Sequence, residues 1–197
     1  MFNQSPLAVA LKEWAIVTDL LTDGKCCLLL RKGGIHEDAG PGRFRLDHDQ
    51  YLFFPAWEHE RLDWIKPSWL PARETLKLAD GHLAVPENIT FRGFGETAKV
   101  WKIPSRAAFE TLDDLHPWGK AQVDMRFNYK PGQPLFLFAV RAYKLAKPVT
   151  VKNDASFSGC RSWVPIAPAV DVAESTPAMS DAEFAAVIRR VDSVMEK

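Results

Sequence analysis

The chain has 197 residues and a mass of 22.2 kDa, which predicts a single domain. Its composition is that of a globular protein, because 47% of the residues are hydrophobic and 25 basic side chains balance 25 acidic ones. No apolar run approaches the roughly 20 residues that span a bilayer, and the N-terminal stretch lacks the basic region of a signal peptide. Three cysteines do not make a disulfide framework. We therefore expect a cytoplasmic protein that does not enter a membrane.

The charges are unevenly distributed along the chain. Residues 91–161 carry 12 basic and 6 acidic side chains, whereas the segments on either side are acidic. This pattern is typical of a solvated surface of mixed charge, and it is also compatible with a surface that binds a polyanion.

The predicted elements are mixed without regular alternation. The spacing of Leu7, Leu11, Trp14 and Leu21 predicts a helix that ends near Gly24. Apolar or alternating runs predict strands over residues 25–31, 51–54, 91–103, 135–145 and 157–166. Further helices are expected from residue 105 to about 115 and over 118–129, and a polar loop or hairpin over 36–49.

The C-terminal segment has the clearest local signal. Residues 165–179 are rich in Pro and Ala, and Ser180 and Glu183 form a capping-box pattern ahead of an apolar stripe. We expect one α+β domain over residues 1–168, a linker over 169–180 and an amphipathic helix over 181–197 that is an appendage to the fold. The domain itself is expected to contain a small, strongly bent sheet with flanking helices.

Motifs for metal or cofactor chemistry are weak. The five histidines have no spacing typical of metal ligands, and neither a phosphate-binding loop nor a nucleophile elbow is present. We expect no bound metal and no cofactor. An enzyme site built from Glu37, His59 and Cys160 is the alternative that stays open.

Cations and aromatic residues gather near the ends of the predicted strands. If these strands share a sheet, the residues are candidates for contacts with phosphates and a stacked base: Arg31, Lys32, Arg141, Tyr143, Arg161 and Trp163. The alternative is that the tryptophans belong to the core and that the cations surround the sheet edge. For Arg31, a structural pairing with Glu37 across the loop is the competing account.

Five ordered segments resemble a bacterial family, the domain of unknown function family numbered 1802, over about residues 7–168. These segments are 10–15, 28–35 with Glu37, 51–55 with Glu58 and His59, 141–148, and 158–164. The resemblance implies only a context: some members are similar to partners of restriction-endonuclease catalytic domains, which would leave this domain the task of recognition.

A second resemblance concerns the fold. Gly24 and Arg31 have the spacing seen at the start of PUA-like barrels of the ASCH group. The positions that match the catalytic residues of that group hold Cys26, Cys27 and Leu29, which cannot perform its acid–base chemistry. A PUA-like barrel would imply nucleic-acid binding without amidohydrolase activity.

Taken together, these patterns favour a non-enzymatic module that binds or senses DNA or RNA and that is linked to restriction–modification or defence, with a restriction endonuclease subunit as a possible partner. A small hydrolase or nuclease and a protein-interaction subunit are the alternatives.

Overall fold

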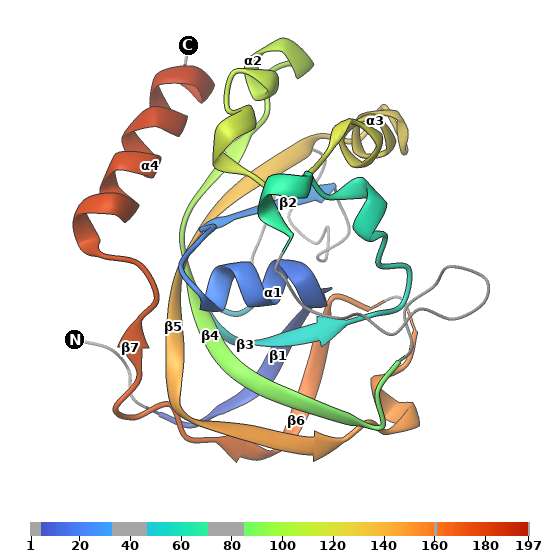
Figure 1. The fold of residues 1–197 in the computed structure, drawn as a ribbon, viewed down its shortest axis with the longest axis vertical. Helices are drawn as coiled ribbons and strands as arrows, with labels where there is room; N and C mark the ends of the chain where they lie inside the picture. The colour runs from blue at the N-terminus through green and yellow to red at the C-terminus, as the bar shows by residue number, and fades with distance from the viewer. Residues whose placement is uncertain (1–4, 33–46, 71–84, 160, 197) are drawn as a thin grey trace.

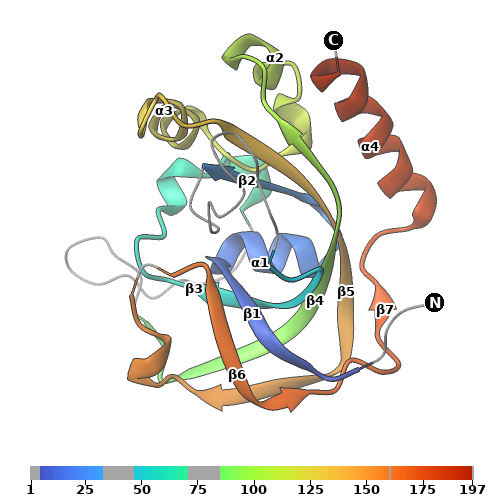
Figure 2. The ribbon, with the colours of Figure 1, turned by 180° about the vertical axis from the view of Figure 1, so that it is seen from behind.

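The computed structural model describes residues 5–32, 47–70, 85–159 and 161–196. It has an α+β architecture in which an open, strongly curved mixed sheet wraps around a short helix (Figures 1 and 2). The strands are β1 (Leu7–Trp14), β2 (Leu28–Lys32), β3 (Gln50–Ala56), β4 (Asn88–Lys102), β5 (Leu135–Lys152), β6 (Trp163–Val170) and β7 (Thr176–Pro177). The α-helices are α1 (Ala15–Thr22), α2 (Arg106–Glu110), α3 (Lys120–Asn128) and α4 (Asp181–Met195).

The strand order is β2-β5-β4-β3-β1-β6, and β7 pairs with β5 outside this path. Only the β1–β3 pairing is parallel; the other pairings in this sheet are antiparallel. The long strands β4 and β5 pair along most of their length, and their register shifts at two places, which are sites where β-bulges bend a sheet. This curvature brings β2 around toward β1.

The N-terminal prediction of one helix is wrong, because residues 7–14 form β1 and the helix begins only at Ala15. The strand lies between β3 and β6, and Leu11 and Lys12 are both buried, although they point to opposite faces. A strand covered on both faces needs no polar–apolar alternation. Its apolar residues therefore matched a helical spacing by coincidence.

Helix α1 is buried inside the curve of the sheet, and its start is held by a distant residue. Trp14 precedes the helix and provides no side-chain cap. Instead, Glu60 Oε1 accepts a hydrogen bond of 2.6 Å from the backbone N–H of Ile16. A buried carboxylate thus satisfies one of the free amides of the first turn, where negative charge is favourable.

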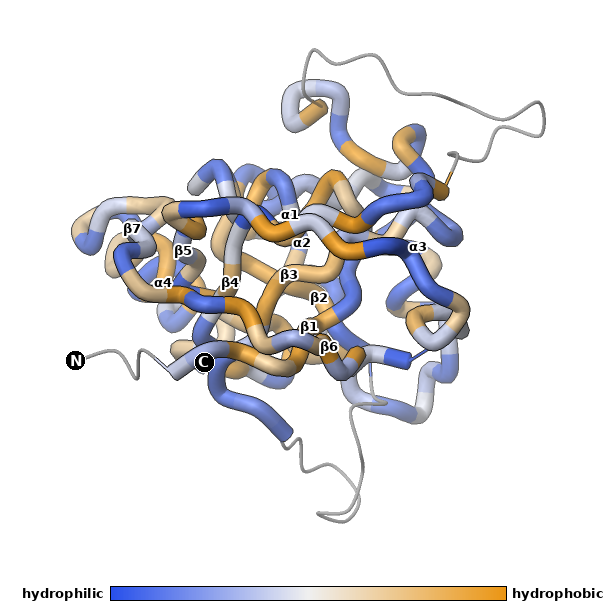
Figure 3. The backbone as a smooth tube through the Cα atoms, turned by 90° about the horizontal axis from the view of Figure 1, so that it is seen from below, coloured by the Kyte–Doolittle hydropathy of each residue, from blue (hydrophilic) through white to orange (hydrophobic). Residues whose placement is uncertain are grey.

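The core has two apolar clusters, and the larger one contains residues from both faces of β5. Figure 3 shows the apolar stretches concentrated in the strands and in α1. One cluster includes α1 and β2, and it also contains Val191 of α4. The other lies mainly between β3, β4, β5 and β6, where Phe54 and Phe91 pack together.

The C-terminal helix forms with the expected capping box: Ser180 Oγ accepts from the Glu183 amide, and the Glu183 carboxylate accepts from the Ser180 amide. The helix packs on the outer side of β4 and β5 (Figures 1 and 2). The Pro- and Ala-rich stretch before it contains the end of β6 and all of β7. The expected strand over 157–166 instead begins at Trp163, after a 3₁₀ turn at Ala155–Phe157.

Candidate functional site

Arg31, at the end of β2, reaches β1. Its Nη2 donates to the carbonyl oxygen of Lys12 at 2.6 Å and lies 2.9 Å from Oε2 of Glu13. Both side chains of this ion pair are largely buried, with 14% of Arg31 and 11% of Glu13 exposed. The Nε of Arg31 is buried as well, and no described residue accepts its hydrogen. The guanidinium is thus anchored at one end and unsatisfied at another.

A second guanidinium shares this environment. Arg126 of α3 is partly buried, and burial lowers its pKa. The charge of Glu13 opposes that shift, whereas the charge of Arg31 adds to it. The buried Nε of Arg126 also lacks a partner among the described residues. Glu13 therefore pairs with Arg31 and also acts electrostatically on Arg126.

An aromatic wall borders these charges. The rings of Tyr51 and Trp163 meet edge to face with their centroids 5.2 Å apart. The centroid of the His48 ring lies 5.0 Å from that of Trp163. Burial raises the pKa of Tyr51 to about 12, although the hydrogen bond of its hydroxyl to Thr97 acts in the opposite direction. Trp163 Nε1 is buried without an acceptor in the described parts of the chain.

We call Glu13, Arg31, Tyr51, Arg126 and Trp163 the mouth cluster. The charges of Glu13 and Arg31 act on both Tyr51 and Arg126, which places the group in one neighbourhood. It contains three buried N–H donors that have no acceptor among the described residues. A buried donor without an acceptor is costly, so such a site favours a ligand rich in acceptor atoms.

The remaining predicted cations have other contacts. Lys32 is buried and donates to the carbonyl oxygen of Phe127 at 3.0 Å, and burial lowers its pKa. Arg141 forms an ion pair with Asp181 at the start of α4, with its guanidinium 5.1 Å from the centre of the Phe184 ring. In this structure both residues take part in contacts between elements.

Tyr143 is buried, with its ring stacked on Phe94 at a centroid distance of 4.9 Å. It belongs to the cluster on the other face of the sheet from Tyr51. The structure therefore brings together Arg31 and Trp163 of the predicted residues, and places Arg141 and Tyr143 near α4.

A second polar site lies on the opposite face of β1. A cavity of about 270 Å³ is lined by Lys12, Ala56, Glu58, His59, Gly159 and Arg161. We call it the Lys12 cavity. Of the alternative enzyme residues, His59 lies here, whereas Glu37 and Cys160 lie outside the described residues.

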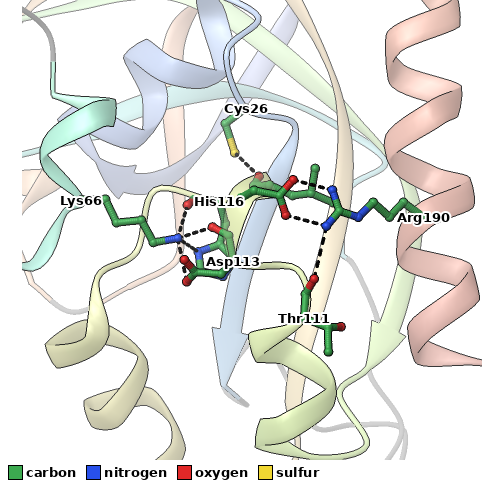
Figure 4. Close-up of polar contacts among 8 residues, drawn as sticks. Cys26, Lys66, Thr111, Asp113, His116 and Arg190 are labelled. Carbon is green, nitrogen blue, oxygen red and sulfur yellow. Dashed lines mark hydrogen bonds and ion pairs between the residues drawn. The ribbon is translucent and has the colours of Figure 1, made fainter.

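A third polar group, around His116, joins elements of the fold (Figure 4). Lys66 Nζ donates to the carbonyl oxygen of His116 at 2.9 Å and pairs with Asp113 at 2.9 Å. The His116 ring stacks on Phe109 with 4.6 Å between centroids, and burial, followed by the charge of Lys66, lowers its pKa to about 4. Arg190 of α4 pairs with the neighbouring Asp114. We interpret this group as a structural joint, because Lys66 and Arg190 connect it to other elements, although the buried Nε2 of His116 has no partner among the described residues.

Three members of the mouth cluster, Glu13, Tyr51 and Arg126, were not predicted as site residues from the sequence. Glu13 lies within the first segment of the family resemblance, beside Lys12, but nothing local indicated that it pairs with Arg31. Arg126 has no signal of its own, since a cation in a polar helix is usually solvated. In the described ranges, no group of three or more His, Cys, Asp or Glu side chains is arranged to hold a metal ion.

The structure defines an α+β domain with an open, curved mixed sheet. The chain belongs to the family described as a domain of unknown function (DUF1802), whose profile matches residues 10–190. No curated protein and no solved structure matches it. Every helix in the described ranges is too short or too polar to cross a lipid bilayer.

Proposed function

We propose that this domain binds nucleic acid and that the mouth cluster holds an unpaired base together with the adjoining phosphate. The observation that carries the proposal is a set of three buried N–H donors, on Arg31, Arg126 and Trp163, that have no acceptor in the part of the chain that the structure describes. Bases present carbonyl oxygens and ring nitrogens, and phosphates present anionic oxygens, so both supply the missing acceptors.

The aromatic wall and the net charge support the same class of ligand. Trp163 is partly exposed and is held edge to face by the buried ring of Tyr51, so a flat ring can pack against Trp163, and base–aromatic stacking is tolerant of sequence. The Arg31–Glu13 ion pair holds one guanidinium in place before the ligand arrives. Such preorganisation lowers the entropy that binding costs.

A role in recognition agrees with the context that the family resemblance implies. We propose that the domain selects the nucleic acid, and that a separate restriction endonuclease subunit performs the cleavage. In the mouth cluster the carboxylate of Glu13 is engaged in an ion pair with Arg31.

Fluorescence polarisation with labelled single- and double-stranded DNA and RNA, at two salt concentrations, tests the proposal. Arg126→Gln is expected to weaken binding and to reduce the log–log salt slope by about one if the arginine contacts a phosphate. Trp163→Phe keeps a ring and removes Nε1, and should weaken binding as well. Arg92→Gln is the matched control, because Arg92 is exposed and pairs with Asp19 outside the mouth cluster.

Thermal melts of each variant separate a loss of binding from a loss of folding. The proposal is overturned if the wild-type protein binds none of the four nucleic acids, or if Arg126→Gln and Arg92→Gln reduce the affinity equally.

The hydrolase alternative has one observation in its favour. His59 and Glu58 line the same cavity as Lys12, which brings a titratable ring, a carboxylate and an amine together. Incubation of the protein with nucleic acids and with simple phosphate esters tests it, and His59→Gln should abolish any turnover that this site performs.

A further inference from the structure

We infer that the Lys12 cavity is a binding site for a phosphate-class oxyanion. Without the anion, Lys12 pairs with Glu58, and the bound anion takes the place of the Glu58 carboxylate. The inference goes beyond the proposed function, because the site lies on the face of β1 opposite the mouth cluster. At about 270 Å³ the cavity is close to the lower end of small-ligand pockets, roughly 300 Å³.

Lys12 is the centre of the argument. Only 9% of its side chain is exposed, and its Nζ lies over the ring of Phe54, 5.3 Å from the ring centre. The Nζ contacts are long: 3.4 Å to Oε2 of Glu58 and 3.3 Å to the carbonyl oxygen of Gly159. Charge-assisted hydrogen bonds of this type are usually about 2.7–2.9 Å. A buried ammonium with long contacts leaves room for a better acceptor.

Arg161 adds a second positive charge. It is exposed, and its guanidinium has no hydrogen-bond or ion-pair partner among the described residues. Its backbone N–H donates to the carbonyl oxygen of Gly159 at 2.9 Å, and both residues line the cavity. Gly159 has φ of +92°, and a Cβ there would meet nothing within 4 Å, so the glycine is needed for its conformation.

His59 completes the lining from a third direction. It has φ of +63°, in the left-handed region that non-glycine residues rarely adopt. The three nitrogen-bearing side chains thus come from β1, from the loop after β3 and from the segment before β6. Donors that converge from separate elements suit a tetrahedral oxyanion better than a planar carboxylate.

Glu58 is placed so that an anion can displace it from Lys12. Its side chain is 42% exposed, so it can turn into solvent without burying an unpaired charge. When it leaves, Lys12 and Arg161 face the ligand with two positive charges. A phosphate carries about −1.5 to −2 charges near pH 7 and has several acceptor oxygens. It therefore compensates Lys12 better than the single carboxylate does.

Titration calorimetry with inorganic phosphate tests the site. Arg161→Gln should weaken phosphate binding about tenfold or more, the usual result of losing one charge-assisted contact. Glu58→Gln should strengthen it, because the competing carboxylate is gone. Arg92→Gln should leave it unchanged. Equal affinity in the wild type and in all three variants, or no measurable binding to the wild type or to Glu58→Gln, overturns the inference.

Two further experiments identify the source of the phosphate and distinguish this inference from the proposed nucleic-acid binding at the mouth cluster. A phosphomonoester and a dinucleotide phosphodiester compete with inorganic phosphate to different extents, which distinguishes a free phosphate group from a polynucleotide backbone. Arg126→Gln is expected to retain phosphate binding. Loss of nucleic-acid binding in that variant, together with normal phosphate binding, places the two ligands in separate sites.

Discussion

Arg31 and Glu13 form a largely buried ion pair that connects β2 to β1, although β5, β4 and β3 lie between these strands in the sheet. The same guanidinium donates to the backbone of Lys12. The open sheet is therefore linked across its curve by one side chain. This contact stabilises the curve and also holds a cation at the mouth.

Removing one partner of this pair should destabilise the fold. Arg31→Ala and Glu13→Ala each leave a largely buried charge without its partner, which typically costs about 3–5 kcal/mol. Chemical denaturation measures the loss. Arg92→Ala is the control, since its exposed ion pair with Asp19 is expected to contribute less than about 1 kcal/mol. Equal effects of Arg31→Ala and Arg92→Ala would show that the link is not structural.

The C-terminal helix should contribute to the stability of the domain. Val191 is fully buried in the main core cluster, and the indole N–H of Trp101 donates to Asp192 at 2.8 Å. Although the composition of the linker predicts a separable appendage, these contacts lead us to expect that truncation after residue 170 gives a less cooperative, dye-binding protein. Val191→Ala should cost about 2 kcal/mol.

Thermal denaturation and binding of a hydrophobic dye measure both changes. Arg189→Ala, on the exposed side of α4, is the control and should stay within about 0.5 kcal/mol of the wild type. If the truncated chain unfolds as cooperatively as the full chain, the prediction is wrong and the helix is a separable appendage.

Stability should fall as the pH decreases from about 6.5 to about 4, in part because of His116. Its pKa in the folded state is about 4, below the unfolded value of 6.5, so the unfolded state binds the proton more tightly. The contribution is fully present above pH 6.5 and amounts to about 3 kcal/mol. His116→Gln should flatten the pH dependence of the unfolding free energy in this range. An unchanged slope in His116→Gln would contradict the assignment.

Cys26 and Cys27 should be unreactive in the native protein. Burial raises the pKa of each thiol to about 12, so very little nucleophilic thiolate exists at pH 7–8. Alkylation followed by peptide mass spectrometry should show slow labelling of both residues in the native state and rapid labelling after denaturation. Similar rates in the two states would mean that this part of the core opens readily.

Local signals in the sequence determined the elements whose stabilising contacts are also local. The capping box of Ser180 and Glu183 and the apolar stripe after it predict α4, and the structure confirms that helix. The long apolar runs likewise predict β2 and β5, because a strand buried on both faces needs little beyond β-forming hydrophobic residues. The α+β class followed from the mixture of these elements.

The sheet order and the mouth cluster were decided only by the tertiary structure. Residues 7–14 form a strand because β3 and β6 supply hydrogen-bond partners on both sides. These partners are distant in the sequence, so the local pattern does not predict them. Glu13 meets Arg31 because bulges curve β4 and β5 until the distant strands approach each other. Ion pairs of this kind depend on the position of the backbone and on burial. The sequence therefore indicated Arg31 and Trp163 as residues of interest, while the fold brings Glu13, Tyr51 and Arg126 next to them.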